Sequence, residues 1–170
     1  GPIISQARIP ITDADTNGTL FAKLSNLARQ LLLETLPSII EGTANRIEQA
    51  EDQVSFAYNI QPEEEELKFN RTATQLDCQV RALMPDPVAH LWFQDRRIKV
   101  GKVHPVLATT TLPAGTVVAY DKKKLWLAAG QQTVLALDEV QPAGKKMMPI
   151  GAFLNGIKPL VIGEQVIYHE

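Results

Sequence analysis

Basic side chains form three short groups in the second half of this chain of 170 residues. The groups lie where strands are expected to end or turn, so they could face one side of a folded domain. Clustered ammonium and guanidinium groups neutralise phosphates in a way that depends on salt but not on nucleotide sequence. We therefore expect a polyanion-binding surface made by Arg96, Arg97, Lys99 and Lys102, by Lys122, Lys123 and Lys124, and by Lys145 and Lys146.

The distribution of charge along the chain points the same way, although the net charge is only −2. Residues 1–85 hold 7 Lys and Arg against 12 Asp and Glu, a net charge of −5, whereas residues 86–170 hold 10 against 7, a net charge of +3. A mildly basic second half suits a polyanionic partner. A solvated surface with uneven charge explains the same numbers, so charge alone does not decide between the two.

The chain shows none of the common patterns of a complete enzyme. Its histidines, His90, His104 and His169, are scattered, and none is spaced with Cys, Asp or Glu as in a zinc site. No P-loop, G-x-G-x-x-G, G-x-S-x-G or H-E-x-x-H pattern occurs. Asp13 and Asp15 resemble a carboxylate pair that divides acid and base roles, but they precede an expected helix, where capping explains them more simply. We expect no metal site and no catalytic group here.

Cysteine content and hydropathy indicate the setting. Cys78 is the only cysteine, which excludes an internal disulfide and fits a reducing compartment. No apolar stretch approaches the roughly 20 residues needed to span a bilayer, and the first residues do not resemble a signal peptide. Apolar residues make up 45% of the chain and charged residues 21%, enough for a real core. We expect a globular, cytoplasmic protein with no membrane partner.

Two segments of the first half have clear patterns of their own. Residues 3–11 alternate and are rich in β-branched side chains, which predicts a strand. Residues 43–67 become polar and acidic and end in four consecutive glutamates. Such a run indicates either a linker between two bodies or a solvated loop.

A helix is expected between these two segments, over residues 19–36. Pro37 should break it or restart it, and Gly42 should end a further helical piece at the left-handed cap position. One face of the helix would be apolar, because leucines recur at steps of four, three and four. These leucines are Leu20, Leu24, Leu27 and Leu31.

The second half predicts one helix followed by a small barrel. Thr72 and Gln75 have the spacing of a capping box, and Pro85 ends the helix that they begin. The apolar period then falls toward two, as in short strands separated by turns, which suggests a closed or partly open β-barrel. The aromatic residues Trp92, Phe93 and Trp126 are expected in its core rather than stacked on bases. The six expected strands cover residues 88–94, 96–103, 115–120, 124–129, 132–140 and 164–170.

Several segments, taken together, resemble the methionyl-tRNA formyltransferase family. The closest resemblance is QPAGKKMMPIGAFLNG, residues 141–156, which is similar to a motif near that family's C-terminus. Residues 1–49 resemble the end of its formyltransferase domain, with PI, DT, G-x-L, the leucine-rich helix and EGTA in the expected order. QLDCQVRALMPDP and RRIKVGKV resemble the segments that follow. The chain departs from the pattern at Asp86, at Gly101 and at Lys68 with Phe69.

The resemblance implies transfer of a formyl group from 10-formyltetrahydrofolate to the amino group of methionine on initiator transfer RNA. In that family an Asn, a His and an Asp of the N-terminal domain perform the transfer, and the Asp lies just before a Thr-Gly-Pro sequence. This chain begins at Gly1 and Pro2. The resemblance therefore implies that the chain lacks the catalytic groups, binds no cofactor itself and is inactive alone.

The fold implied is a remnant of a Rossmann-like α/β domain followed by an all-β barrel similar to an OB-fold. The boundaries that follow are residues 1–46 for the remnant, 47–69 for a linker and 70–170 for a transfer-RNA-binding domain. By the same resemblance Lys145 and Lys146 match the family's G-K-K step and are the best phosphate contacts. Arg96, Arg97, Lys99, Lys122, Lys123 and Lys124 are chosen by charge and expected loop position alone.

Other functions stay open at this point. A sugar-amine formyltransferase or a formyltetrahydrofolate hydrolase would have a related formyl-handling domain without needing a basic surface. A non-catalytic RNA-binding module would need the basic surface alone. The leucine face of the first helix is also unfavourable to expose, so a homodimer through that face is a further hypothesis.

Overall fold

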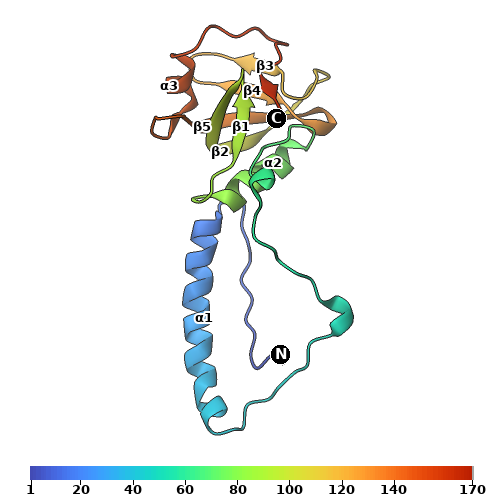
Figure 1. Ribbon diagram of the computed structural model, residues 1–170, viewed down its shortest axis with the longest axis vertical. Helices are drawn as coiled ribbons and strands as arrows, with labels where there is room; N and C mark the ends of the chain where they lie inside the picture. The colour runs from blue at the N-terminus through green and yellow to red at the C-terminus, as the bar shows by residue number, and fades with distance from the viewer. Residues whose placement is uncertain (170) are drawn as a thin grey trace. The chain divides into compact units, whose positions relative to one another are not determined.

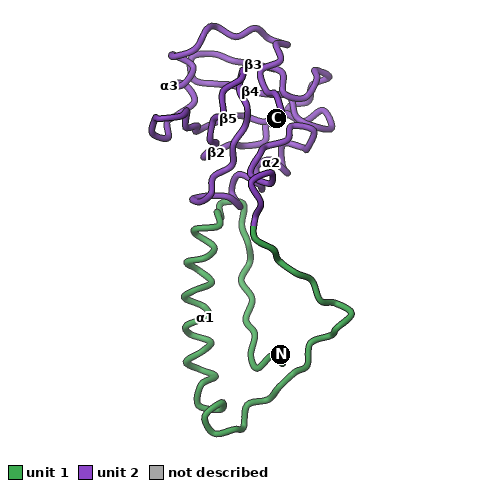
Figure 2. The backbone as a smooth tube through the Cα atoms, in the orientation of Figure 1, with its two compact units in different colours: residues 1–59 green, residues 60–170 purple. Residues whose placement is uncertain are grey.

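A computed structural model describes residues 1–169 of the chain. The residues form two compact units, 1–59 and 60–170 (Figure 2). The first unit is built around one long helix, and the second is built around an antiparallel sheet (Figure 1).

The helix of the first unit, α1, runs over Asn17–Ile40. Thr16 caps its start, because its side chain accepts from the backbone N–H of Thr19 while the Thr19 side chain accepts from the Thr16 N–H. The expected break at Pro37 is wrong, since the helix continues to Ile40. Pro37 lies one turn from the end, so its missing N–H costs a single bond, and its own carbonyl still accepts from Glu41 at 3.0 Å. Gly42 follows the cap with φ +72°, as predicted.

The segment before α1 differs from its prediction. Residues 3–11 do not form a strand; only Ile3 pairs, in an isolated antiparallel bridge with Ile47. An alternating pattern needs a neighbouring strand to become a ladder, and in residues 1–59 the structure places no strand beside this segment.

Asp15, just before α1, has a different role from the cap that we expected. Its carboxylate binds the N–H and hydroxyl of Thr12, both at 2.9 Å, and the ammonium of Lys23 at 2.6 Å. The Lys23 ammonium, followed by the Thr12 donors, holds the pKa of Asp15 well below its ordinary range. The prediction that Asp13 or Asp15 caps α1 is thus wrong, because Thr16 is the N-cap. Asp15 instead links the preceding turn to the helix through its bonds to Thr12 and Lys23.

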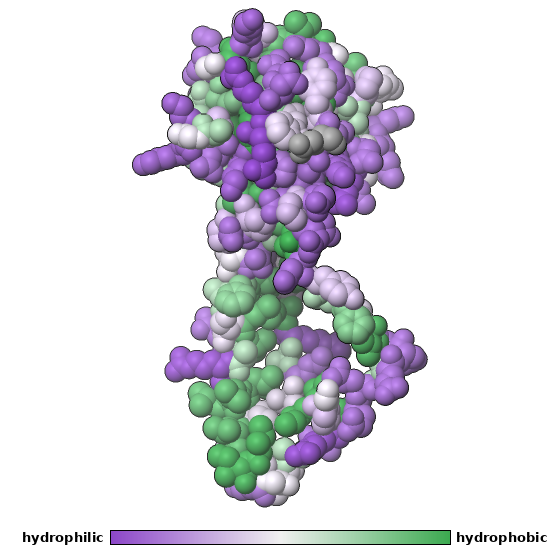
Figure 3. All heavy atoms as spheres, in the orientation of Figure 1, coloured by the Kyte–Doolittle hydropathy of each residue, from purple (hydrophilic) through white to green (hydrophobic). Residues whose placement is uncertain are grey.

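The apolar side chains of α1 are largely uncovered, since no residue of the helix is buried. Phe21 is 70% exposed and Ile40 is 76% exposed, while Leu20, Leu27 and Leu31 are half-buried. Figure 3 shows apolar side chains gathered over the first unit. The leucine face that the sequence predicted is therefore present and only partly covered.

The second unit contains one sheet with strand order β3-β4-β5-β2-β1-β7, and β6 pairs with β5. All these pairings are antiparallel. The six predicted strands are confirmed in order, although β2 is longer and β7 shorter than expected, and β6 was not anticipated. The strands are β1 (His90–Phe93), β2 (Arg96–Thr109), β3 (Val117–Tyr120), β4 (Leu125–Ala128), β5 (Thr133–Pro142), β6 (Met148–Pro149) and β7 (Ile167–Tyr168).

The sheet curls until its two edges meet. The segment entering β3 bonds to the segment entering β7: Val117 N–H donates to the Glu164 carbonyl at 2.9 Å, and Val166 N–H donates to the Gly115 carbonyl at 3.1 Å. An antiparallel bridge between Thr116 and Gln165 lies between these bonds. The expectation of a small barrel is consistent with this curled sheet.

The core lies between the curled sheet and α2 (Ala73–Leu83). The predicted capping box of Thr72 and Gln75 is confirmed, and α2 buries its predicted apolar face against the sheet. Phe93 packs edge-on against Phe153, with ring centroids 5.4 Å apart, in the short helix α3 (Ile150–Leu154). Three turns of 3-10 helix complete the elements, at Glu51–Gln53, Pro62–Glu64 and Gly130–Gln132.

The segment leading into α2 is part of the second unit's core. Leu67 and Phe69 are fully buried, although both lie in the stretch expected as a linker. Their segment runs parallel to β1 at one point, where Leu67 N–H donates to the His90 carbonyl at 2.7 Å. The four glutamates beside them stay exposed or half-buried, as a charged run should.

Candidate nucleic-acid interface

The sheet register brings the three basic groups to the same end of the strands. Lys99 pairs with Gln141 near the C-terminal end of β5, and Lys145 and Lys146 lie in the turn that follows β5. The β3–β4 turn holds Lys122, Lys123 and Lys124. Leu125, the first residue of β4, pairs with Leu137 in the middle of β5, so in this antiparallel pair the turn before β4 lies toward the C-terminal end of β5. The groups are about 20 residues apart in sequence but converge in the fold.

The first group is only partly free to bind an anion. Arg97 lies 3.6 Å from the Glu65 carboxylate and 3.1 Å from His90 Nδ1, so its charge is already engaged. Lys99 donates to the Pro87 carbonyl at 3.3 Å. Arg96, in contrast, is exposed and has no side-chain partner among the described residues. We therefore expect Arg96 to contribute more than Arg97 or Lys99 to any phosphate contact.

The second group is fixed by Asp121 at the head of the turn. The Asp121 carboxylate accepts the Lys123 N–H at 2.8 Å and lies 3.6 Å from the Lys124 ammonium. The Lys123 N–H, followed by the Lys124 charge, lowers the pKa of Asp121. Lys124 also sits 4.7 Å above the Trp126 ring. Lys122 and Lys123 have no side-chain partner among residues 1–169 and stay exposed.

The third group is held by its backbone and not by its side chains. The Gln141 amide donates to the Lys145 carbonyl at 2.8 Å, and the Lys145 N–H donates to the Pro142 carbonyl at 3.1 Å. Both lysines are exposed, and neither ammonium has a partner in the described part of the chain. These hydrogen bonds already fix the backbone of the turn. An anion that binds there would therefore have to order only the two lysine side chains.

The aromatic residues divide between the two faces of the sheet. Phe93 is buried in the core, as predicted. Trp92 and Trp126 are half-buried on the opposite face, so the core prediction is only partly right for them. The indole N–H of Trp92 is buried without an acceptor among the described residues.

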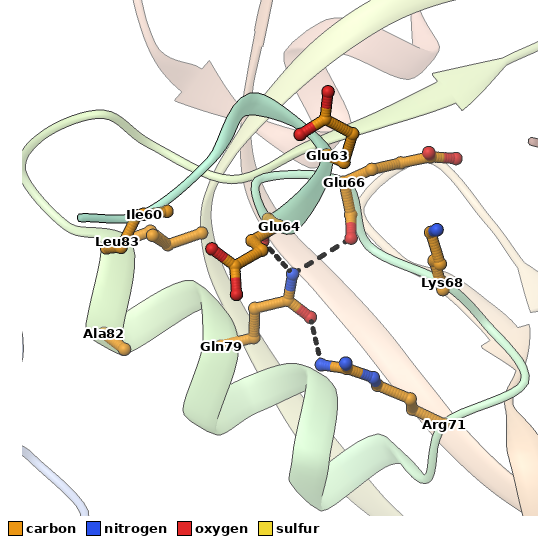
Figure 4. A pocket seen from close by; sticks show the side chains of 9 residues that line it. All are labelled: Ile60, Glu63, Glu64, Glu66, Lys68, Arg71, Gln79, Ala82 and Leu83. Atoms are coloured by element: carbon orange, nitrogen blue, oxygen red, sulfur yellow. Dashed lines mark hydrogen bonds between the residues drawn. The ribbon is translucent and has the colours of Figure 1, made fainter. Parts of the chain in front are cut away.

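A hollow of about 380 Å³ between the segment before α2 and α2 itself is unsuited to a polyanion. Glu63, Glu64 and Glu66 line it together with Lys68 and Arg71, so the acidic side chains are in the majority. Figure 4 shows how Gln79 crosses this hollow: its amide donates to the carbonyls of Glu64 and Glu66, at 2.8 and 2.9 Å, and accepts from Arg71. The acidic lining would repel phosphates, so we place no nucleic-acid contact there.

The described residues offer neither a metal site nor a membrane-spanning helix. In residues 1–169, no three His, Cys, Asp or Glu side chains lie close enough together to hold a metal ion. Within the same residues, none of the helices has the length and apolar character required to cross a membrane.

Sequence reasoning missed one basic residue near these groups, Lys158. It lies a few residues after α3, and it borders the same hollow as Lys122. An isolated lysine gives no cluster signal in a sequence. Its position two residues after the motif that ends at Gly156 was the only available hint.

Solved structures share the fold at low sequence identity. A variant of HypX from Aquifex aeolicus is 13% identical with a TM-score of 0.64, and the match covers 92% of this chain and 28% of that one. WlaRD, described as a sugar 3N-formyl transferase, is 16% identical with a TM-score of 0.61 over 86% of this chain and 51% of that one. At such identities the likeness shows the fold alone.

Curated relatives are much more similar in sequence. A methionyl-tRNA formyltransferase of Levilactobacillus brevis is 48% identical over 98% of this chain and 53% of the relative. Another, from Latilactobacillus sakei subsp. sakei, is 49% identical over all of this chain and 54% of the relative. The chain thus spans about half the length of the curated relatives that it matches. The model of the family described as "Formyl transferase, C-terminal domain" matches residues 59–158, which is most of the second unit, and the chain therefore belongs to this family.

Proposed function

We propose that this chain is the transfer-RNA-binding part of a methionyl-tRNA formyltransferase. The whole enzyme would move a formyl group from 10-formyltetrahydrofolate to the amino group of methionine on initiator transfer RNA. The observation that supports this most is the 48% identity to a methionyl-tRNA formyltransferase over 98% of the chain. The three basic groups lie at one end of the strands, which supports the assignment of RNA binding to this part of the enzyme. Phosphate contacts supply most of the sequence-independent affinity for nucleic acid.

The second unit would be an OB-fold-like barrel, and residues 1–46 would be the end of a Rossmann-like domain. The linker between them would be shorter than the expected residues 47–69, because Leu67 and Phe69 belong to the core of the second unit. Residues 70–170 would then bind RNA, in the cytoplasm and without a metal. The closed curl of the sheet supports a barrel, and the uncovered apolar side chains of α1 suit a helix that belongs to a larger body.

The RNA contacts are proposed at the free cations first. Lys145 and Lys146 present unpartnered ammonium groups on a fixed turn, and Arg96, Lys122 and Lys123 are equally free. Arg97, Lys99 and Lys124 already have partners, so they would contribute less. No catalytic group is proposed in this chain, and no folate would be bound by it alone.

The test is binding of the chain to initiator transfer RNA over a salt series. Lys145→Ala/Lys146→Ala removes two proposed contacts, and Arg8→Ala/Lys68→Ala is the matched control, because it also removes two exposed charges. We expect the first pair to weaken binding and to reduce the salt slope by about two, and the control to change little. Absence of binding by the unaltered chain at low salt would overturn the proposal.

A sugar-amine formyltransferase is an alternative function, because the fold is similar to that of WlaRD. That activity has no need for a nucleic-acid surface, as would also hold for a formyltetrahydrofolate hydrolase. A non-catalytic RNA-binding module would bind RNA equally well, but formyl transfer would not return when the other half of a curated relative is joined to this chain. Measuring formyl transfer by that fusion separates the last rival from our proposal.

A further inference from the structure

The β3–β4 turn and the segment after α3 border an open hollow of about 400 Å³. A volume of this size is in the range of small-ligand pockets. The segment after α3 provides an apolar wall, made by Leu154, Ile157, Pro159 and Leu160, and the same segment carries Asn155 and Lys158. The β3–β4 turn, on the other side, contributes Tyr120, Asp121 and Lys122.

The polar groups of this hollow are available to a ligand. The side chains of Lys122, Lys158, Tyr120 and Asn155 have no hydrogen-bond or ion-pair partner among the described residues. Asp121 is the exception, since its carboxylate accepts the Lys123 N–H and lies near the Lys124 ammonium. The acidic group is thus neutralised from the turn, and two cations remain to attract an anion.

The shape of the hollow is set by close backbone packing. A Cβ at Gly151 would lie 2.7 Å from the Lys122 carbonyl oxygen, so only glycine lets α3 approach the β3–β4 turn this closely. The two walls therefore have a fixed separation, as a preformed site requires. The basic turn of Lys145 and Lys146 is nearby along the chain, because β6 alone separates it from α3.

We propose that this hollow binds one nucleotide of the RNA. Its phosphate would lie between Lys122 and Lys158, and its base would lie against the apolar wall with the Asn155 amide at its edge. Two cations suit the phosphate of a nucleotide, and an apolar surface with a neutral amide suits its base, whereas a bare anion would leave the apolar wall unused. This inference rests on the proposed function, because it deepens the RNA contact.

The test compares Lys158→Ala with Lys68→Ala, since each removes one exposed, unpartnered lysine from the second unit. Binding of initiator transfer RNA is measured across a salt series, with Lys158→Gln as a second variant that keeps most of the side chain. We expect both changes at Lys158 to weaken binding about fivefold to tenfold and to lower the salt slope by about one. Lys68→Ala should stay within about twofold of the unaltered chain.

A second measurement follows the Asn155 side-chain amide by NMR during addition of uridine monophosphate, with inorganic phosphate as comparison. The nucleotide should shift the Asn155 signals, and phosphate alone should shift them less, because it leaves the apolar wall empty. If Lys158→Ala behaves as Lys68→Ala while Lys145→Ala/Lys146→Ala weakens binding, the nucleotide pocket is wrong and the RNA proposal stands. If the unaltered chain binds no RNA, both are wrong.

Discussion

The backbone carbonyl of Lys122 lies directly against Gly151, where a Cβ would come within 2.7 Å of the oxygen. Lys122 belongs to a basic turn, and Gly151 to the motif that resembles formyltransferases, so this contact joins the two features that the sequence suggested separately. A backbone atom has little freedom to move away, and the fit depends on the missing side chain.

Gly151→Ala should therefore destabilise the second unit by about 1–3 kcal/mol, because the added methyl group forces the turn and α3 apart. Gly156→Ala is the control, since a Cβ there meets only the Phe153 carbonyl, at an ordinary 3.5 Å. Urea unfolding of both variants measures the difference in free energy. Equal stabilities for the two variants would contradict the close-packing argument.

Gln79 should be important for the attachment of residues 64–66 to α2. Its amide donates to two carbonyls, those of Glu64 and Glu66. Gln79→Ala leaves both without this donor, and we expect a loss of about 1–3 kcal/mol in the free energy of unfolding.

Thr74→Ala on the same helix is the control for Gln79, because Thr74 is exposed and has no side-chain partner among the described residues. Hydrogen exchange gives a local readout, since the His90 N–H donates to the Glu65 carbonyl. Exchange at His90 should accelerate in Gln79→Ala and not in Thr74→Ala. Unchanged exchange and stability would mean that Gln79 does not fasten this segment.

Lys23→Met should raise the pKa of Asp15 toward the ordinary carboxyl value of about 3.9, since the Lys23 ammonium is the largest cause of its lowering. Arg29→Met is the control, because Arg29 has no contact with Asp15. NMR titration of the Asp15 carboxyl carbon measures the pKa in each variant. A pKa of Asp15 that is the same with and without Lys23 would refute this assignment.

The same lowered pKa predicts how the turn before α1 responds to acid. The folded-state pKa of Asp15 is below its unfolded value, so its contribution to stability is complete above the unfolded value. The contribution is lost as the pH falls below about 3.9 and through the folded-state pKa. The Thr12 and Thr19 contacts should therefore persist at pH 5 and weaken progressively in stronger acid, as NOE intensities between these side chains would report.

The hypothesis of a homodimer through the leucine face of α1 predicts association that rises with concentration. Sedimentation equilibrium on the chain would detect it, and Leu24→Glu should abolish it, because Leu24 is 44% exposed on that helix. A single monomeric species over a broad concentration range would eliminate the hypothesis.

Local signals in the sequence predicted local structure well. The capping box at Thr72 and the glycine after Glu41 each involve residues within one turn, and both are confirmed. The strand expected over residues 3–11 failed because a ladder depends on a distant partner. The two-residue strand Met148–Pro149 was missed, since two residues are too few to show a period.

In the candidate site, too, residue types could be predicted from the sequence, but contacts between distant residues could not. The residue types of the basic groups were plain in the sequence, but only the register of β2, β4 and β5 shows that they share an end of the strands. The ion pair of Arg97 with Glu65 joins residues far apart in sequence, so the sequence could not show that Arg97 is already engaged. Lys158 was missed for a similar reason, because Lys122, which lines the same hollow, lies far from it in sequence, in the β3–β4 turn.

The bonds between the segments entering β3 and β7 also bear on how the chain behaves at high concentration. An open sheet presents rows of unpaired amides and carbonyls, onto which strands of other molecules add during aggregation. Here residues 115–117 satisfy those groups within the same molecule, using residues 163–167 as the partner. Because these groups are already paired, we expect this edge of the sheet to offer no template for strands of other molecules, a consequence separate from any contact with RNA.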